Sequence, residues 1–191
     1  MSDRAQFIVL SEDQQAQVFI RKALIKTGAK ARRIRCIEPA SVTDGGAGDA
    51  YVIKKYPLEV KAFRSQSASA LTGLVVHIDA DPRNSVEQRH RQLAAALTDA
   101  PLPPRGQGEH IAELVPKRNI ETWIYALDDS LPSHPCGDLN EVDEFPRLRY
   151  ESGCAAAAEA FAEHARKRTV PRSAGAVPSL LDGLDEFRRL P

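Results

Sequence analysis

The sequence predicts an α/β protein with a mostly parallel sheet flanked by helices. Four short apolar runs alternate with segments in which apolar residues return every three or four positions, the pattern of strand followed by helix. Strands separated by helices pair in parallel, because each helix carries the chain back to the start of the sheet. Of the 191 residues, 42% are apolar, which is enough for one hydrophobic core.

The expected strands span residues 7–10, 32–37, 73–78 and 111–115; in the second, Ile34 and Cys36 or Ile37 face the core. The expected helices span residues 11–25, 51–70, 85–97, 121–127, 154–166 and 178–187. We divide the chain into an α/β domain at residues 1–127 and an addition at residues 128–191, which comprises an irregular acidic segment and C-terminal helices packed on the domain.

Local signals define how three of these helices begin, bend and face the core. Ser11 is the expected N-cap of the first helix, and Gln14 completes a capping box with it. Pro57 predicts a kink or break in the second helix. In the third helix, we expect the charged side chains of Arg89 and Arg91 to face outward.

An abrupt change from apolar to acidic residues marks the end of the third strand. Asp79 and Asp81 lie two residues apart, so along an extended chain both point the same way. Open α/β sheets bind ligands at the carboxyl ends of their strands. Two carboxylates this close repel unless a cation binds them, and their oxygens suit Mg²⁺ or Mn²⁺. The alternative is an ordinary strand exit, in which one Asp makes an Asx-turn or caps the next helix.

Charged residues also follow the first and fourth strands. Glu12 comes directly after the first, and Lys117, Arg118 and Glu121 come after the fourth. Because the carboxyl ends of parallel strands meet at one edge of a sheet, we expect these residues to converge with the acid pair. The alternative for the last group is structural: Asn119 caps the helix, and Glu121 merely suits its positive N-terminal end.

The order of these acids resembles the Toprim domain, which is shared by type IA and type II topoisomerases, bacterial primases, small nucleases and the overcoming-lysogenization-defect nucleases. Its hallmark is a Glu after the first strand and an Asp-x-Asp after a later one, matched here by residues 8–12 and 75–81 within residues 6–125. Residues 11–15 and 117–123 are also similar to those of Toprim-like proteins encoded beside ATPases in prokaryotic defence loci. Asp13 departs from the pattern, because many Toprim domains have Gly there.

The resemblance implies a Toprim/Rossmann-like fold and Mg²⁺-dependent (or Mn²⁺-dependent) cleavage of phosphodiester bonds in DNA or RNA. It implies an effector of anti-phage defence controlled by a partner ATPase, and it leaves open a homo-oligomer. Glu12 would be a metal ligand or the general acid/base. The implied catalytic and metal-binding residues are Glu12, Asp79, Asp81 and Glu121. The implied phosphate-binding residues are Lys117, Arg118 and Arg83.

Two other function classes compete with a nuclease. The first is a non-catalytic subunit that binds a partner ATPase or nucleic acid, with residues 128–144 and the last amphipathic helix as docking surfaces. The net charge of zero favours such dependence on a partner. The second is a phosphatase or phosphotransferase of the doubly wound type, which expects its Asp pair after the first strand, where this chain has Glu12.

Composition predicts a cytoplasmic protein without a membrane span. No apolar run approaches the ~20 residues that a spanning helix needs, and residues 1–6 do not form a signal peptide. The three cysteines, Cys36, Cys136 and Cys154, are odd in number and form no Cys-x-x-Cys motif, so we expect free thiols. His77, inside the third strand, is expected to be a partly buried core histidine.

Overall fold

The computed structural model describes residues 7–40, 48–67, 72–128, 141 and 154–191. Most of the predicted irregular acidic segment and Cys136 lie outside the described residues. So do positions 41–47 of the glycine-rich loop, the stretch of residues 39–49. Cys36 and Cys154 are free thiols, as expected. Among the described helices, none combines the length and the apolar character that crossing a membrane requires.

The centre of the fold is a four-stranded sheet in which every pair of neighbours is parallel. Its strands are β1 (Phe7–Leu10), β2 (Ile34–Cys36), β3 (Gly73–His77) and β4 (Ile111–Leu114). Their order is β2-β1-β3-β4, so β1 and β3 form the middle of the sheet and β4 is an edge. The predicted α/β class with a parallel sheet is therefore confirmed.

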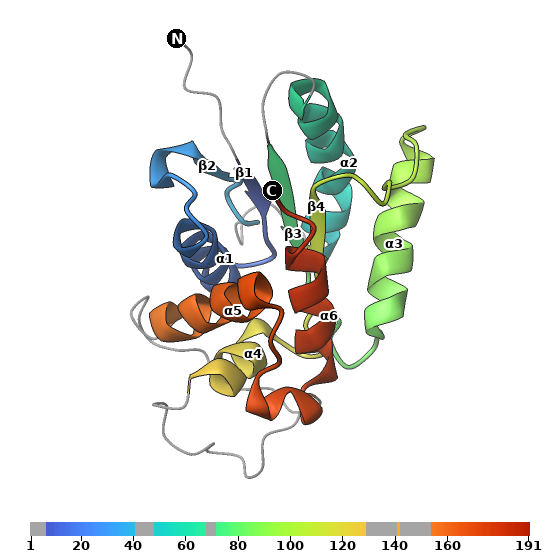
Figure 1. The fold of residues 1–191 in the computed structure, drawn as a ribbon. Helices are drawn as coiled ribbons and strands as arrows, with labels where there is room; N and C mark the ends of the chain where they lie inside the picture. Colours follow the sequence, from blue (N-terminus) through green and yellow to red (C-terminus); the bar gives the residue numbers. More distant parts are fainter. Residues whose placement is uncertain (1–6, 41–47, 68–71, 129–140, 142–153) are drawn as a thin grey trace.

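Six α-helices accompany the sheet within the described part of the chain (Figure 1). They are α1 (Gln14–Lys26), α2 (Gly48–Ser67), α3 (Val86–Asp99), α4 (Ile120–Leu127), α5 (Ala155–Lys167) and α6 (Pro178–Phe187). Pro57 lies inside α2, which continues through it. The second strand is shorter than predicted, because residues 31–33 form a 3₁₀ turn before it.

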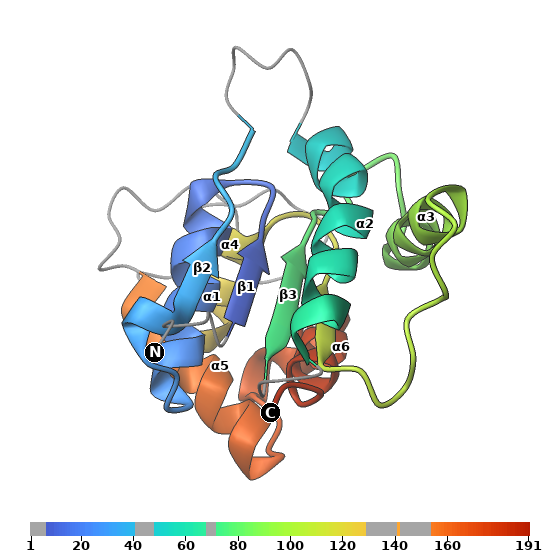
Figure 2. The same cartoon turned by 90° about the horizontal axis from the view of Figure 1, so that it is seen from above.

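The helices form two layers, one on each face of the sheet. Helices α1, α4 and α5 cover one face, and α2 and α3 cover the other (Figures 1 and 2). Each strand supplies both layers because its side chains alternate: Phe7 and Val9 pack on the α1 side, whereas Ile8 and Leu10 pack on the α2 side. This burial on both faces explains why β1 is a continuous apolar run and β3 is one up to His77.

The start of α1 differs from the prediction and matters for the site. Asp13, not Ser11, is the N-cap: its Oδ1 accepts a hydrogen bond of 2.8 Å from the Ala16 amide. The Ser11 hydroxyl instead donates to the Asp13 carbonyl at 3.0 Å. The predicted capping box of Ser11 and Gln14 was wrong, because the chain makes a short turn before the helix begins. Glu12 lies in that turn, outside the helix.

The C-terminal helices complete the core on the α1 side. The Phe161 ring of α5 lies 5.4 Å from Phe19, 5.9 Å from Trp123 and 5.1 Å from Phe187, between ring centroids. The apolar residues of α6 are buried in the same core. The apolar face of α6 is thus covered by its own chain, which corrects the expectation that this helix offers a docking surface. The division at residue 127 stays a prediction.

Helix α6 also protects the edge strand β4. The carboxylate of Glu186 accepts a hydrogen bond of 2.9 Å from the Glu113 amide, and Arg105 donates to the Ile111 carbonyl at 3.1 Å. Arg105 and Glu186 form an ion pair with each other. These side chains satisfy backbone groups that an edge strand would otherwise offer to another chain.

Candidate active site at the carboxyl ends of the strands

The candidate site lies where the order of strands reverses. From β1 the chain moves outward to β2 and then returns to place β3 on the other side of β1. Ligands of open parallel sheets bind in the crevice at such a switch point, outside the carboxyl ends of the strands. Glu12 follows β1 and Asp79 follows β3, and the Glu12 Oε2 accepts a hydrogen bond of 3.0 Å from the Asp79 amide. The structure therefore brings these two predicted residues together.

The side chain of Glu12 is partly buried and surrounded by negative charge. Burial is the main cause that raises its pKa from 4.5 to about 7, and the charges of Asp79 and Asp49 act in the same direction. The hydrogen bond from the Asp79 amide and the charge of His77 oppose the shift without cancelling it. Glu12 can therefore gain or lose a proton near neutral pH, as a general acid/base must.

A glycine makes room for Glu12. A Cβ added to Gly48, the first residue of α2, would lie 2.5 Å from the Glu12 Cγ and 3.0 Å from the Glu12 carbonyl oxygen. No real Cβ tolerates such a contact. The end of the glycine-rich loop thus packs directly on the candidate site, although residues 41–47 lie outside the described part of the chain.

Asp79 is held by a buried histidine. The Asp79 Oδ1 lies 3.2 Å from the Nε2 of His77, whose side chain is wholly buried. Burial lowers the pKa of His77, but the charge and hydrogen bond of Asp79 outweigh it and leave this pKa raised. His77 is more deeply buried than predicted, and its contact with Asp79 makes it part of the site as well as of the core.

Asp81 does not follow the extended geometry from which the acid pair was predicted. Its φ angle is 61°, in the left-handed region, so the alternation of side chains ends before it. Its Oδ1 accepts a hydrogen bond of 2.8 Å from the Arg83 amide, which is the Asx-turn of the alternative interpretation. Its Oδ2 lies 3.4 Å from Arg89. The carboxylates of Asp79 and Asp81 therefore have different partners instead of sharing one.

Sequence reasoning misplaced Arg89, which is buried at 2% exposure instead of facing outward. Its Nε donates to the Asp79 carbonyl at 2.9 Å, and its Nη2 lies 3.0 Å from the Asp49 Oδ2. Spacing could have revealed this position, because residue 89 comes three after Val86 and four before Leu93, on the apolar face. Sequence reasoning also missed Asp49, which follows Gly48 at the start of α2.

The residues after β4 lie at the same edge of the sheet. Backbone pairing continues beyond β3, since the Ala80 amide donates to the Pro116 carbonyl at 2.9 Å. Lys117 therefore follows a residue that is bonded to the stretch between Asp79 and Asp81. Lys117 and Arg118 are partly buried, and Arg83 is exposed. Glu121 is 2% exposed in the first turn of α4.

With 2% of its surface exposed, Glu121 is too deeply buried to contact a substrate in this structure.

The side chain of Asn119 does not cap α4 by bonding a backbone amide. Its Oδ1 accepts a hydrogen bond of 2.9 Å from the Thr122 hydroxyl. The roles predicted for Glu121, Lys117, Arg118 and Arg83 stay predictions.

The donor set fits a hard divalent cation. Glu12 and Asp79 both carry carboxylates and are joined by a hydrogen bond from the Asp79 amide to the Glu12 carboxylate, and Mg²⁺ commonly takes one or two carboxylates with water and substrate phosphate completing its shell. Bound metal would favour the charged form of Glu12, whose pKa is raised mainly by burial and further by the charges of Asp79 and Asp49. Within the described ranges, no three His, Cys, Asp or Glu side chains are arranged to hold a metal together.

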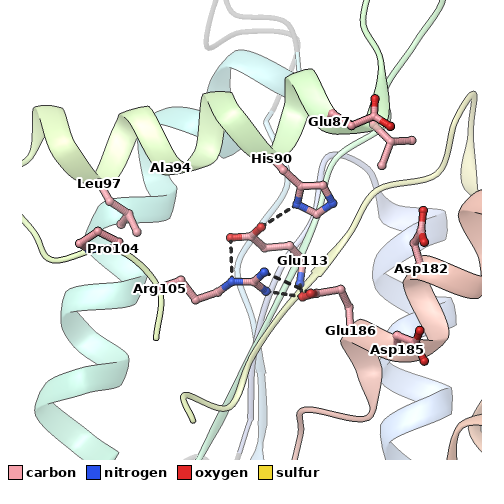
Figure 3. Close-up of a pocket in the computed structure, with 11 residues that line it drawn as sticks. Glu87, His90, Ala94, Leu97, Pro104, Arg105, Glu113, Asp182, Asp185 and Glu186 are labelled. Carbon is pink, nitrogen blue, oxygen red and sulfur yellow. Dashed lines mark hydrogen bonds and ion pairs between the residues drawn. The ribbon is translucent and has the colours of Figure 1, made fainter. Parts of the chain in front are cut away.

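A cavity of about 520 Å³ lies elsewhere, between α3, β4 and α6 (Figure 3). On its wall, Glu113 accepts a hydrogen bond of 2.6 Å from the Tyr56 hydroxyl and lies 2.8 Å from the His90 Nδ1. Burial raises the pKa of Glu113, but His90, Arg105 and Tyr56 together leave it lowered. These side chains satisfy one another's hydrogen bonds and charges beside the edge strand. We therefore assign them a structural role and place the candidate site at the strand ends.

No protein-family model, no curated protein and no solved structure matches the chain. Among the features of the strand ends, the contact between Glu12 and Asp79 across the switch point of the sheet points most directly to a function.

Proposed function

We propose that the protein is a metal-dependent nuclease that cleaves phosphodiester bonds in DNA or RNA. The observation that carries the proposal is the pairing of Glu12 and Asp79 at the switch point, with a Glu12 pKa of about 7. A general acid/base works best with a pKa near the operating pH, and the strand-end crevice is where a substrate would bind.

The residues of the site would have the following tasks. Asp79 would hold Mg²⁺ or Mn²⁺, which would supply charge neutralisation at the phosphate and an activated water. Glu12 would be either a second ligand of the metal or the group that moves a proton at its Oε atoms, and His77 would fix the orientation of Asp79. Lys117 and Arg118, at the adjacent strand end, would bind phosphate oxygens.

The link to anti-phage defence and to a partner ATPase is a proposal that rests on the Toprim resemblance alone. The alternative of a non-catalytic subunit would keep the same fold without cleavage. The buried apolar face of α6 removes one of the docking surfaces that this alternative used. The geometry therefore favours the enzyme as the first hypothesis to test.

The test is cleavage of plasmid DNA and of structured RNA by the purified chain with Mg²⁺, Mn²⁺ or EDTA. We expect metal-dependent cleavage that Asp79→Asn abolishes and Glu12→Gln lowers by at least about 100-fold, the usual scale for loss of a general acid/base. Asp99→Asn is a matched control, because Asp99 is an exposed acid at the far end of α3.

Three outcomes separate the hypotheses. Cleavage that survives in both site variants would exclude this site as its source. If Asp99→Asn also abolishes cleavage, the loss would follow from removing an acidic side chain anywhere on the protein and would not identify this site. No cleavage by the wild type, alone or with an ATPase encoded beside it, would favour the non-catalytic subunit.

A further inference from the structure

The guanidinium of Arg89 is a buried cation enclosed by oxygen atoms. Its Nε donates to the Asp79 carbonyl at 2.9 Å, and its Nη2 lies 3.0 Å from the Asp49 Oδ2 and 3.4 Å from the Asp81 Oδ2. Its Nη1 donates to the Gln92 side chain at 3.0 Å. The partners come from the start of α2, the turn after β3 and α3 itself.

Such an arrangement has to be compensated electrostatically. Arginine stays charged in proteins, so at 2% exposure Arg89 cannot avoid the cost of burial by losing its proton. Asp49 and Asp81 supply the compensating charge, and Asp81 does so from a left-handed backbone conformation that residues other than glycine seldom adopt. Strain of this kind persists only where the surroundings fix the residue.

Two carboxylates and a backbone carbonyl are also the ligands that a divalent cation takes. In the structure Arg89 already occupies this set, and Asp81 is further engaged by the Arg83 amide. The carboxylates of Glu12 and Asp79 have other partners: Glu12 accepts a hydrogen bond from the Asp79 amide, and the Asp79 carboxylate lies beside His77. One acidic residue predicted as a metal ligand is therefore committed to an internal cation.

We infer that Arg89 takes the place of a second cation, so that the site binds one divalent metal at Glu12 and Asp79, and that Asp49 belongs to the site as a partner of Arg89. This inference rests on the proposed function, because it concerns the metal that cleavage would need. Arg89 is a positioning residue: its burial keeps it from a substrate, and it fixes the turn that carries Asp79 and Asp81.

The test counts bound metal by equilibrium dialysis of the purified chain against Mn²⁺. The wild type is expected to bind one Mn²⁺ per chain, and Arg89→Met is expected to bind two, because it frees the oxygens around Arg89. Arg89→Lys keeps the charge and should still bind one. Arg91→Met is the matched control, since Arg91 is an exposed arginine on the same helix, and it should also bind one.

Circular dichroism establishes that each variant is folded. Two Mn²⁺ in the wild type, none in the wild type, or only one in folded Arg89→Met would overturn the inference. If Arg89→Met does not fold, the wild-type count and Arg89→Lys decide it, because two ions in either contradict a single-metal site. The proposed function fails separately, when the expected metal counts are found but neither DNA nor RNA is cut.

Discussion

Replacing Glu12 by Gln is expected to remove a pH dependence of folding stability. The folded-state pKa of Glu12 is about 7, raised from its ordinary value of 4.5. Between these two values the folded protein holds a proton that the unfolded chain has released, so the free energy of unfolding falls as the pH rises. Stability from this group is fully present below pH 4.5 and is lost by the time the pH passes about 7.

The size of the effect follows from the shift. At about 1.4 kcal/mol per pKa unit, the rise from 4.5 to about 7 corresponds to a total of about 3 kcal/mol, of which about 2.5 kcal/mol lies between pH 5 and pH 8. Gln keeps the shape of the side chain and an oxygen that can accept the Asp79 amide, so it removes the charge alone.

The assay is urea unfolding in EDTA at pH 5 and pH 8. The free energy of unfolding of Glu12→Gln minus that of wild type should be about 2.5 kcal/mol larger at pH 8 than at pH 5. The same difference for Asp99→Asn should not change with pH. A difference between Glu12→Gln and wild type that is equal at both pH values would refute the reasoning. Adding Mn²⁺ at pH 8 should stabilise the wild type and leave Glu12→Gln less affected, since the metal favours the charged carboxylate.

Three other substitutions test the close packing around two glycines and the charge network on β4. Gly48→Ala places a Cβ 2.5 Å from the Glu12 Cγ and should lower metal affinity and cleavage at least about 10-fold, measured by titration and assay. Gly183→Ala places a Cβ 2.1 Å from the Trp123 ring and should cost about 3 kcal/mol in urea unfolding. Glu113→Gln removes the buried carboxylate that Tyr56, His90 and Arg105 contact and should cost about 2 kcal/mol at pH 7.

Gly108→Ala is the control for both glycine substitutions, because a Cβ there meets nothing within 4 Å. Its stability and activity should match those of wild type. Unchanged metal affinity in Gly48→Ala would show that Glu12 does not need its present position. Wild-type stability in Gly183→Ala or Glu113→Gln would contradict the close packing of α6 or the charge network on β4.

The fold was predictable because its signals are local and agree with one another. Residues 73–76 carry no polar side chain since both faces of β3 are buried, and the helix predicted over residues 85–97 is observed as α3, which begins with a capping box of Ser85 and Gln88. Topology then brought Glu12 and Asp79 together without further information.

The finer geometry of the site was less predictable, for physical reasons. The left-handed φ of Asp81 goes with contacts to the Arg83 amide and to the buried Arg89, and the extended strand before it gives no indication of either. Arg89 was assigned outward from its charge, although its spacing favoured the core and two acids on other segments could neutralise it. A buried ion pair depends on both partners at once, so a pattern along one helix cannot reveal it.

The position of α6 in the chain has a consequence for biosynthesis. The ribosome completes β4 and Trp123 well before it reaches Pro178, the first residue of α6. During that interval Glu186 has not yet capped the backbone of β4, and the Trp123 ring lacks its partner at Gly183. The nascent chain therefore carries an open strand edge and an uncovered aromatic surface, features that promote aggregation and attract chaperones until the last helix docks.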